Sequence, residues 1–323
     1  MRRGIPFDSI LVFVSCIVML AGLVSCEDPK SQTAPSRGAS PSGEPQAAES
    51  AVLNVIASNA PLAYFAAQIG GETVKVAMVA PADVDPAFWT PATADIITLQ
   101  AADLILLNGA GFEPWRARVS LPERNVVVTA DSFRSTWIVE DGVTHSHGLQ
   151  GSHSHGETAF TTWINPMSAI EQARAIKDAL VKARPAHATD MESRFGAVER
   201  DLRDLDGRLE AAIGGQQALP IIFSHPVYQY LQQRFSLNAI SVHWEPEEMP
   251  SADALKDLET ALTEHPARWM IWEDEPGNAI RAKLRELGIE SIVFAPAGNM
   301  GSDWSKWLER QYENAAELAK VYQ

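Results

Sequence analysis

Closely spaced histidines are the residues of this chain best suited to chemistry. His145, His147, His153 and His155 occupy two His-Ser-His-Gly repeats within residues 141–157, and they are half of the chain's 8 histidines. Neutral imidazole is a good zinc and copper donor, and one tetrahedral zinc shell needs about four such ligands. The glycines and serines predict a mobile loop, so we expect metal binding of modest affinity. The alternative is a polar surface loop with chance histidines.

A second group of metal-binding residue types lies toward the C-terminus, after three short predicted strands. His225, His243 and the run Glu273, Asp274 and Glu275 each follow one of these strands. The strands are predicted at Ile221–Phe223, Ala239–Val242 and Trp269–Trp272, and a helix that begins at Pro226, with Ser224 as its cap, is predicted after the first of them. Open α/β sheets bind ligands at the carboxyl ends of their strands, so a metal site built from these residues is one interpretation. The alternatives are a packed or surface histidine and a solvated acidic loop.

Five tryptophans lie in or beside the same motifs. They are Trp89, Trp115, Trp163, Trp244 and Trp272. One interpretation is a pocket for a small organic ligand or a metal chelate, and the other is ordinary packing.

Patterns typical of catalytic sites are absent from the sequence. It has no His-Glu-x-x-His, no Gly-x-Ser-x-Gly and no phosphate-binding Gly-Lys-Ser/Thr loop. We therefore expect a binding protein and not an enzyme. The formal charge of -15 also argues against nucleic acid, because phosphates require a basic surface, whereas it is compatible with a cationic cargo.

The elements that must position these residues form two series of alternating strands and helices. The first series has strands at Val52–Ala57, Val74–Val79, Leu104–Leu107 and Val126–Val128, and the second adds Ser291–Phe294. This alternation predicts an α/β fold of two lobes, each with a mostly parallel sheet flanked by helices. We place the N-terminal lobe at residues 51–185 and the C-terminal lobe at residues 216–323.

A long helix is predicted to join the lobes within residues 186–215. Apolar residues recur there at intervals of four and three, namely Met191, Phe195, Val198, Leu202, Leu205 and Leu209. Such spacing puts one apolar stripe on one helix face. A rigid helix between lobes implies limited domain closure.

The N-terminus has the pattern of a targeting segment. Arg2 and Arg3 precede an apolar run that ends in Leu-Val-Ser-Cys at Cys26. This pattern resembles the lipobox of bacterial lipoproteins, so residues 1–26 are interpreted as a lipoprotein signal peptide with Cys26 lipidated. Residues 27–50 are rich in Ser, Pro, Ala, Gly and Glu and predict a flexible tether. The body should lie outside the cytoplasmic membrane, periplasmic or on the cell surface.

Several motifs in order resemble one family, the solute-binding proteins of zinc- and manganese-type metal ABC transporters. They are Asp85-Pro86-Ala87-Phe88-Trp89-Thr90-Pro91, Asn108-Gly109-Ala110-Gly111-Phe112-Glu113-Pro114-Trp115, Thr161-Thr162-Trp163-Ile164-Asn165-Pro166, Phe223-Ser224-His225-Pro226-Val227-Tyr228 and Val293-Phe294-Ala295-Pro296-Ala297-Gly298. The resemblance implies two lobes, a linking helix and a metal between the lobes. It also implies ligands at Ala87, Thr161, His225 and Ala295, of which only His225 is a strong donor.

The resemblance predicts the binding component of a metal importer, with zinc as the expected ion and manganese or another divalent metal not excluded. Its partners would be an ABC permease and its ATPase, with the protein a monomer held by its lipid. We expect zinc chiefly on the histidines of residues 141–157, with a weaker site at His225. The alternatives are a module for a chelated metal or organic ligand, and an interaction lipoprotein with a vestigial cleft.

Overall fold

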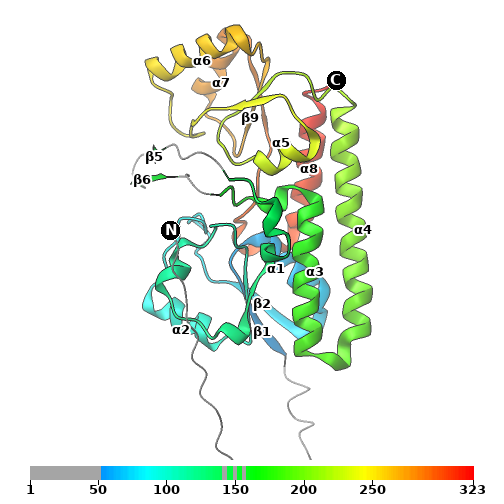
Figure 1. Ribbon diagram of the computed structural model, residues 1–323. Helices are drawn as coiled ribbons and strands as arrows, with labels where there is room; N and C mark the ends of the chain where they lie inside the picture. The colour runs from blue at the N-terminus through cyan, green and yellow to red at the C-terminus, as the bar shows by residue number, and fades with distance from the viewer. Residues whose placement is uncertain (1–51, 140–143, 148–150, 155–157) are drawn as a thin grey trace, which may run out of the picture. The chain divides into compact units, whose positions relative to one another are not determined.

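The computed structural model describes residues 52–139, 144–147, 151–154 and 158–323 (Figure 1). The predicted signal peptide, Cys26 and the tether at 27–50 lie outside the described residues, and so does His155. Within the described part of the chain, no helix has both the length and the apolar character needed to cross a bilayer.

The N-terminal lobe is built on a four-stranded parallel sheet. Its strands, in spatial order, are β2 (Val74–Met78), β1 (Leu53–Ala57), β3 (Leu104–Leu107) and β4 (Val126–Val128). Helices α1 (Ala60–Gly70) and α2 (Thr93–Ala101) supply connections between the strands. The side chain of Asn59 accepts a hydrogen bond from Leu62 N and so caps α1, whose first turn also contains a proline.

The C-terminal lobe repeats this plan with a second parallel sheet. Its spatial order is β10 (Glu290–Val293), β9 (Trp269–Trp272), β7 (Ile221–Phe223) and β8 (Ala239–Ser241). Its helices are α5 (Gln229–Phe235), α6 (Ala252–Glu264) and α7 (Asn278–Glu286). The predicted α/β fold with two separate, mostly parallel sheets is therefore confirmed.

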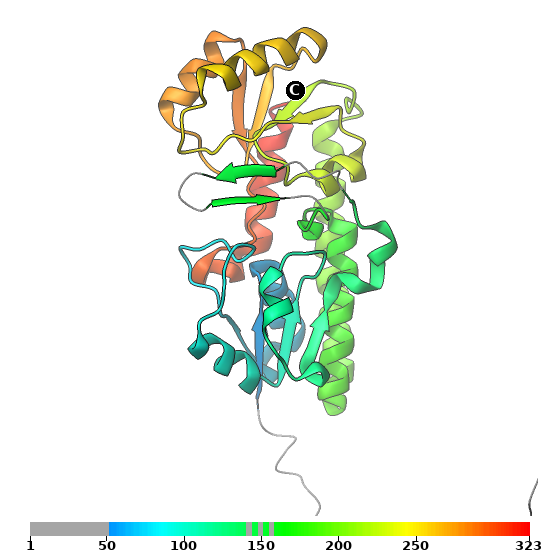
Figure 2. The same ribbon diagram turned by 60° about the vertical axis from the view of Figure 1, so that its left-hand side comes forward.

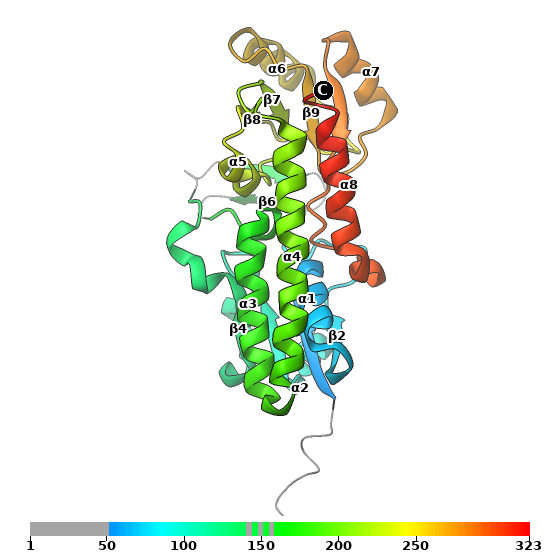
Figure 3. The same ribbon diagram turned by 90° about the vertical axis from the view of Figure 1, so that its right-hand side faces the viewer.

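Three helices lie side by side on one side of the molecule (Figure 3). They are α3 (Pro166–Ala183), α4 (Ala188–Ile213) and α8 (Trp307–Ala319), and α4 passes both lobes. All six residues of the predicted apolar stripe on α4 are buried. They belong to one core cluster that also contains Val55 of the first sheet and Phe223 of the second. The two lobes therefore share a hydrophobic core along α4.

Hydrogen bonds also connect the lobes near their sheets. Trp163 Nε1 donates to Pro296 O at 2.8 Å, and Ala60 N donates to Gly298 O at 2.8 Å. The amide of Asn299 donates to the carbonyl oxygens of the segment 81–84, at 2.7 Å to Val84 O. These contacts hold the segment that leads to Asp85 against the C-terminal lobe.

The His-rich segment contains regular backbone structure where the sequence predicted a mobile loop. Strands β5 (Thr144–His147) and β6 (Gly151–Ser154) pair antiparallel, with His145 opposite His153 (Figure 2). Both strands are short and polar, so their pairing satisfies backbone hydrogen-bonding groups without a hydrophobic face.

One local prediction was wrong at the start of α5. The sequence favoured a helix from Pro226 with Ser224 as its cap, but α5 begins at Gln229. A tight turn in which Val227 N bonds His225 O comes first. The Ser224 hydroxyl is buried and has no hydrogen-bond partner among the described residues, so it caps no helix.

Candidate metal site

The site lies where three neighbouring strands of the C-terminal sheet end. The order β9-β7-β8 brings the segments that follow these strands together. Two backbone hydrogen bonds extend the ladder past the strands, because Ser224 N donates to Ile271 O at 2.9 Å and Trp244 N donates to Ser224 O at 2.8 Å. The next side chains along the three segments are those of His225, Glu245 and Glu273. Parallel strands thus place one imidazole and two carboxylates at one sheet edge.

These three side chains have the spacing of a metal-binding group. His225 Nδ1 lies 4.0 Å from Glu245 Oε1 and 4.0 Å from Glu273 Oε1. One ligand atom from each residue lies within 4.8 Å of the others. Zinc bonds of about 2.1 Å in a tetrahedral shell place neighbouring ligand atoms about 3.4 Å apart. Small side-chain rotations would therefore bring the three atoms onto one ion.

The donor set suits a divalent cation. Imidazole and carboxylate are both zinc ligands, while carboxylates also suit manganese and other hard cations. His225 is 5% exposed, whereas the side chains of Glu245 and Glu273 are 36% and 28% exposed. The imidazole therefore lies at the buried end of the group, and an ion could reach it from the side of the two partly exposed carboxylates.

Electrostatic repulsion within the group favours a cation. Burial, together with the nearby carboxyl groups of Glu245, Asp85 and Asp274, raises the pKa of Glu273 to about 8. Burial also raises the pKa of Asp85, although the hydrogen bond from Ala87 N opposes this shift. Asp85 belongs to the N-terminal lobe, so carboxyl groups of both lobes act on Glu273. A bound divalent ion would reverse this unfavourable interaction.

The ligand positions implied by the family resemblance do not form the same group. Ala87 is buried and offers a methyl group. The hydroxyl of Thr161 is already used, since it donates to Val227 O at 2.5 Å. Ala295 is fixed through its backbone, whose N–H donates to Asn314 Oδ1 at 3.0 Å. Only His225 among these positions takes part in the group.

The remaining predicted ligands are placed as follows. The His243 ring is exposed and lies edge-on to the His225 ring with centroids 5.5 Å apart, but the metal-binding group found among the described residues does not include it. His145, His147 and His153 lie on the paired strands β5 and β6, where the structure describes only the backbone.

Sequence reasoning missed Glu245 and the role of Asp85. Glu245 comes two residues after His243, behind the same predicted strand. The argument from strand ends that selected Glu273 would have selected Glu245 as well. Asp85 had no such signal, because only the folded chain brings its lobe against Glu273.

The five tryptophans are buried in hydrophobic cores of the described chain. Trp89 and Trp115 pack against each other edge-on with centroids 5.9 Å apart. Trp244 and Trp272 lie in the core of the C-terminal lobe, and Trp163 lies in the shared core. The packing interpretation is therefore correct.

A family model described as the periplasmic zinc-uptake complex component A, ZnuA, matches residues 55–321. The chain belongs to this family. The family resemblance predicted from the motifs is thus confirmed, over nearly the whole folded part of the chain. The family model matches although Ala87, Thr161 and Ala295 occupy three of the ligand positions that the resemblance implies.

Related ZnuA-family proteins are similar over most of the chain. The zinc-binding lipoprotein AdcA of Streptococcus pneumoniae is 22% identical over 261 residues, covering 79% of this chain and 52% of AdcA. The chain therefore spans about half the length of that relative. The high-affinity zinc uptake system protein ZnuA of Bacillus subtilis is 25% identical over 256 residues, covering 75% of this chain and 77% of ZnuA.

Solved structures show the same ZnuA-type fold. The metal-dependent lipoprotein YcdH from Bacillus subtilis superposes with a TM-score of 0.70 at 20% identity, covering 83% of this chain and 98% of YcdH. The Zn(II)-bound ZnuA-like domain of Streptococcus pneumoniae AdcA gives a TM-score of 0.70 at 19% identity, covering 84% of this chain and 100% of that domain.

Proposed function

We propose that this protein captures a divalent metal ion, zinc in the first place, and delivers it to an ABC permease with its ATPase. The observation that carries the proposal is the group of His225, Glu245 and Glu273 at the ends of β7, β8 and β9. Its role is binding and not catalysis. Family membership supports import as the context, since relatives are named as zinc uptake and zinc-binding proteins.

Cargo binding is assigned to this group on the C-terminal sheet, with the His-rich segment 141–157 as an accessory collector. Three donors converge in the group and include a buried imidazole. The four histidines of the segment supply further donors, three of them on the paired strands β5 and β6. Manganese is the second candidate ion, because two of the three donors are carboxylates.

The test is metal titration of the whole chain in detergent, by calorimetry and by mass spectrometry of bound metal. His225→Ala should abolish one tight site per chain. Deletion of 144–156 should remove weaker sites and leave the tight one. If the deletion abolishes tight binding while His225→Ala leaves it intact, the hairpin holds the cargo and the assignment is wrong.

Attachment to the membrane through a lipid on Cys26, with residues 27–50 as tether, is part of the proposal. It rests on the lipobox-like sequence and on the lipoprotein names of relatives. Cys26→Ser should remove lipid labelling and release the protein from the membrane fraction. Ser25→Ala is the matched control, and equal membrane attachment of both variants would contradict a lipid anchor at Cys26.

A further inference from the structure

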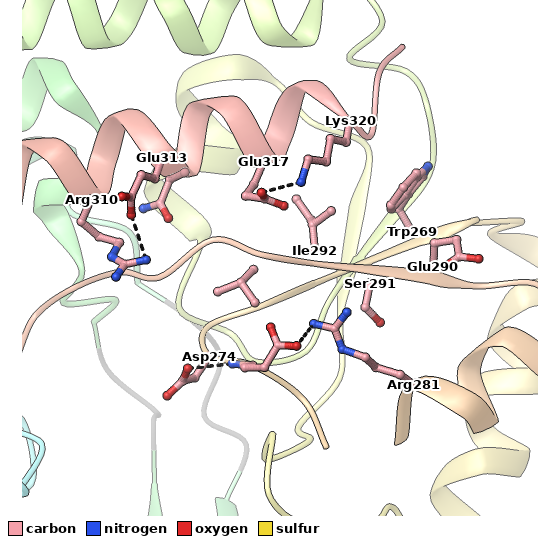
Figure 4. Close-up of a pocket in the computed structure, with 13 residues that line it drawn as sticks. Trp269, Asp274, Arg281, Glu290, Ser291, Ile292, Arg310, Glu313, Glu317 and Lys320 are labelled. Atoms are coloured by element: carbon pink, nitrogen blue, oxygen red, sulfur yellow. Dashed lines mark hydrogen bonds and ion pairs between the residues drawn. The ribbon is translucent and has the colours of Figure 1, made fainter. Parts of the chain in front are cut away.

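A cavity of about 670 Å³ lies along the outer edge of the C-terminal sheet, and its lining includes Asp274, the residue after Glu273 of the metal-binding group. Strand β10 forms one wall as an edge strand with β9 as its neighbour in the sheet. Helix α8 forms the opposite wall through Arg310, Glu313 and Glu317, and Arg281 of α7 closes one side (Figure 4). We call this cavity the β10 groove. A groove between a helix and a sheet edge has the form of a site for an extended chain.

Backbone groups of β10 face this groove. Glu290 N donates a hydrogen bond to Arg268 O, just before β9, at 2.9 Å, and Phe294 N donates one to Trp272 O of β9 at 2.8 Å. Residues alternate along a strand, so the N–H and C=O groups of Ser291 and Val293 point to the other side. An unpaired strand edge is a template for another strand.

Asn314 of α8 marks where pairing on this edge ends. Its Oδ1 accepts from Ala295 N at 3.0 Å, and its Nδ2 donates to Ala295 O at 2.7 Å. One side chain thus makes both bonds that a neighbouring strand would make with Ala295. In the described chain, no side chain does this for Ser291 or Val293. The buried Ser291 hydroxyl, which also lines the groove, likewise has no hydrogen-bond partner among the described residues.

The charge of the β10 groove indicates the chemistry of its occupant. Three cations line it, and each is paired with a lining carboxylate. The pairs are Arg281–Glu275, Arg310–Glu313 and Lys320–Glu317. Asp274 and Glu290 add two further carboxylates, and although Glu290 pairs with Arg285 outside the lining, the lining residues taken together are negative. A basic side chain complements it.

We propose that the β10 groove binds an extended peptide segment with basic side chains at alternate positions, which adds to the sheet as a strand beside β10. Main-chain bonds to Ser291 and Val293 would hold it, and Asp274 and Glu290 would contact its basic side chains. A second copy of the chain fits less well, because its own β10 edge would bring the same negative lining to the contact. The inference rests on the β10 edge and not on metal binding, although Asp274 also acts electrostatically on Glu273.

The test uses a labelled synthetic peptide of alternating lysine and threonine, about eight residues long, the length of an ordinary strand. Two control peptides accompany it. One replaces lysine with glutamate, and the other has the same sequence with alternate backbone amides N-methylated. Fluorescence anisotropy with the whole chain in detergent should show binding of the first peptide. N-methylation should weaken it about tenfold or more, as expected for the loss of one or two hydrogen bonds.

Two variants locate the binding on the protein. Val293→Pro removes an outward N–H without removing a bond to β9, and Glu290→Lys reverses a charge in the groove. Glu286→Lys is the matched control, because Glu286 is an exposed carboxylate of α7 that does not line the groove. The first two should weaken binding about tenfold, and the control should change it less than about twofold.

Each of three results would overturn the proposal. The first is no binding of the lysine peptide. The second is equal binding of its N-methylated form, which would show charge attraction without strand pairing. The third is a concentration-dependent dimer in analytical ultracentrifugation that Val293→Pro abolishes, which would assign the edge to a second copy. The peptide comparison keeps the test valid even if Val293→Pro fails to fold.

Discussion

Replacing Glu273 by glutamine should change metal affinity and protein stability in opposite directions. The substitution keeps the shape of the side chain and removes its charge. In the proposed metal site it replaces a carboxylate 4.0 Å from His225 Nδ1 with a weak neutral donor. In the metal-free protein it removes a carboxyl group whose pKa is raised to about 8 by burial and by its acidic neighbours.

The loss of affinity follows from the number of ligands. Structural zinc sites gain about 10–16 kcal/mol from about four ligands, so one ligand contributes about 3 kcal/mol. The dissociation constant for zinc should therefore rise by about 100-fold. Competition titration against a zinc chelator of known affinity measures this change.

The gain in stability follows from the pKa of Glu273. A carboxyl group whose pKa is raised on folding favours the folded state at low pH and loses that contribution as pH rises from the unfolded value of 4.5 to about 8. At neutral pH the full cost would be about 3 kcal/mol, and partial exposure reduces it to about 2 kcal/mol. Glu273→Gln should raise the Tm of the metal-free protein by about 5 °C.

Glu275→Gln is the matched control for this experiment. It makes the same chemical change two residues away, at an exposed carboxylate that pairs with Arg281. It should leave zinc affinity and Tm nearly unchanged. An unaltered zinc affinity in Glu273→Gln, or a lower Tm of the metal-free variant, would refute the assignment of Glu273 as a ligand held at an electrostatic cost.

Two further predictions concern the frame around the site. Asp206 on α4 accepts two hydrogen bonds from Arg234 on α5, at 2.9 and 2.6 Å. Asp206→Ala should therefore lower the free energy of unfolding, measured by urea titration, by about 2 kcal/mol. Asp204→Ala, on the exposed face of α4, is the control and should change it little. Burial raises the pKa of Glu113 to about 7 despite its hydrogen bonds from Asn108 N and Gly109 N. The contribution of Glu113 to the free energy of unfolding should therefore fall by about 3 kcal/mol as pH rises from the unfolded pKa of 4.5 to about 7. Glu113→Gln should flatten that part of the plot of unfolding free energy against pH. An unchanged plot would contradict the raised pKa of Glu113.

Strands and long helices could be predicted from the sequence because their signals are local. Runs such as Leu104–Leu107 and Trp269–Trp272 agree with the structure at both ends, since short apolar runs between turn residues mark buried strands. The stripe on α4 was equally clear, because buried residues repeat there with helical spacing. The start of α5 was missed, because a backbone turn at His225 competes with the helix signal of Pro226.

The candidate site was only partly predictable because it depends on sheet order. His225 and Glu273 could be selected as residues that follow strands, but their meeting point requires β7 to lie between β9 and β8. Spatial order comes from packing of the whole lobe and is not encoded near any one strand. Glu245 carried the same strand-end signal, but only the folded lobe shows that it, and not His243, joins the group.

The position of the metal-binding group changes how cargo would act on the lobes. The positions implied by the family resemblance divide between the lobes, with Ala87 and Thr161 on one side and His225 and Ala295 on the other. His225, Glu245 and Glu273 all belong to the C-terminal lobe, so an ion could bind there without drawing the lobes together. The core along α4 already holds the lobes to each other.

Coupling between cargo and the N-terminal lobe would then depend on charge. Asp85 acts electrostatically on Glu273 from the segment that Asn299 holds against the C-terminal lobe. An ion on Glu273 would turn this repulsion into an attraction without any change in the shared core. If the proposed site holds the cargo, the segment that carries Asp85 is therefore the part of the N-terminal lobe on which the bound ion acts.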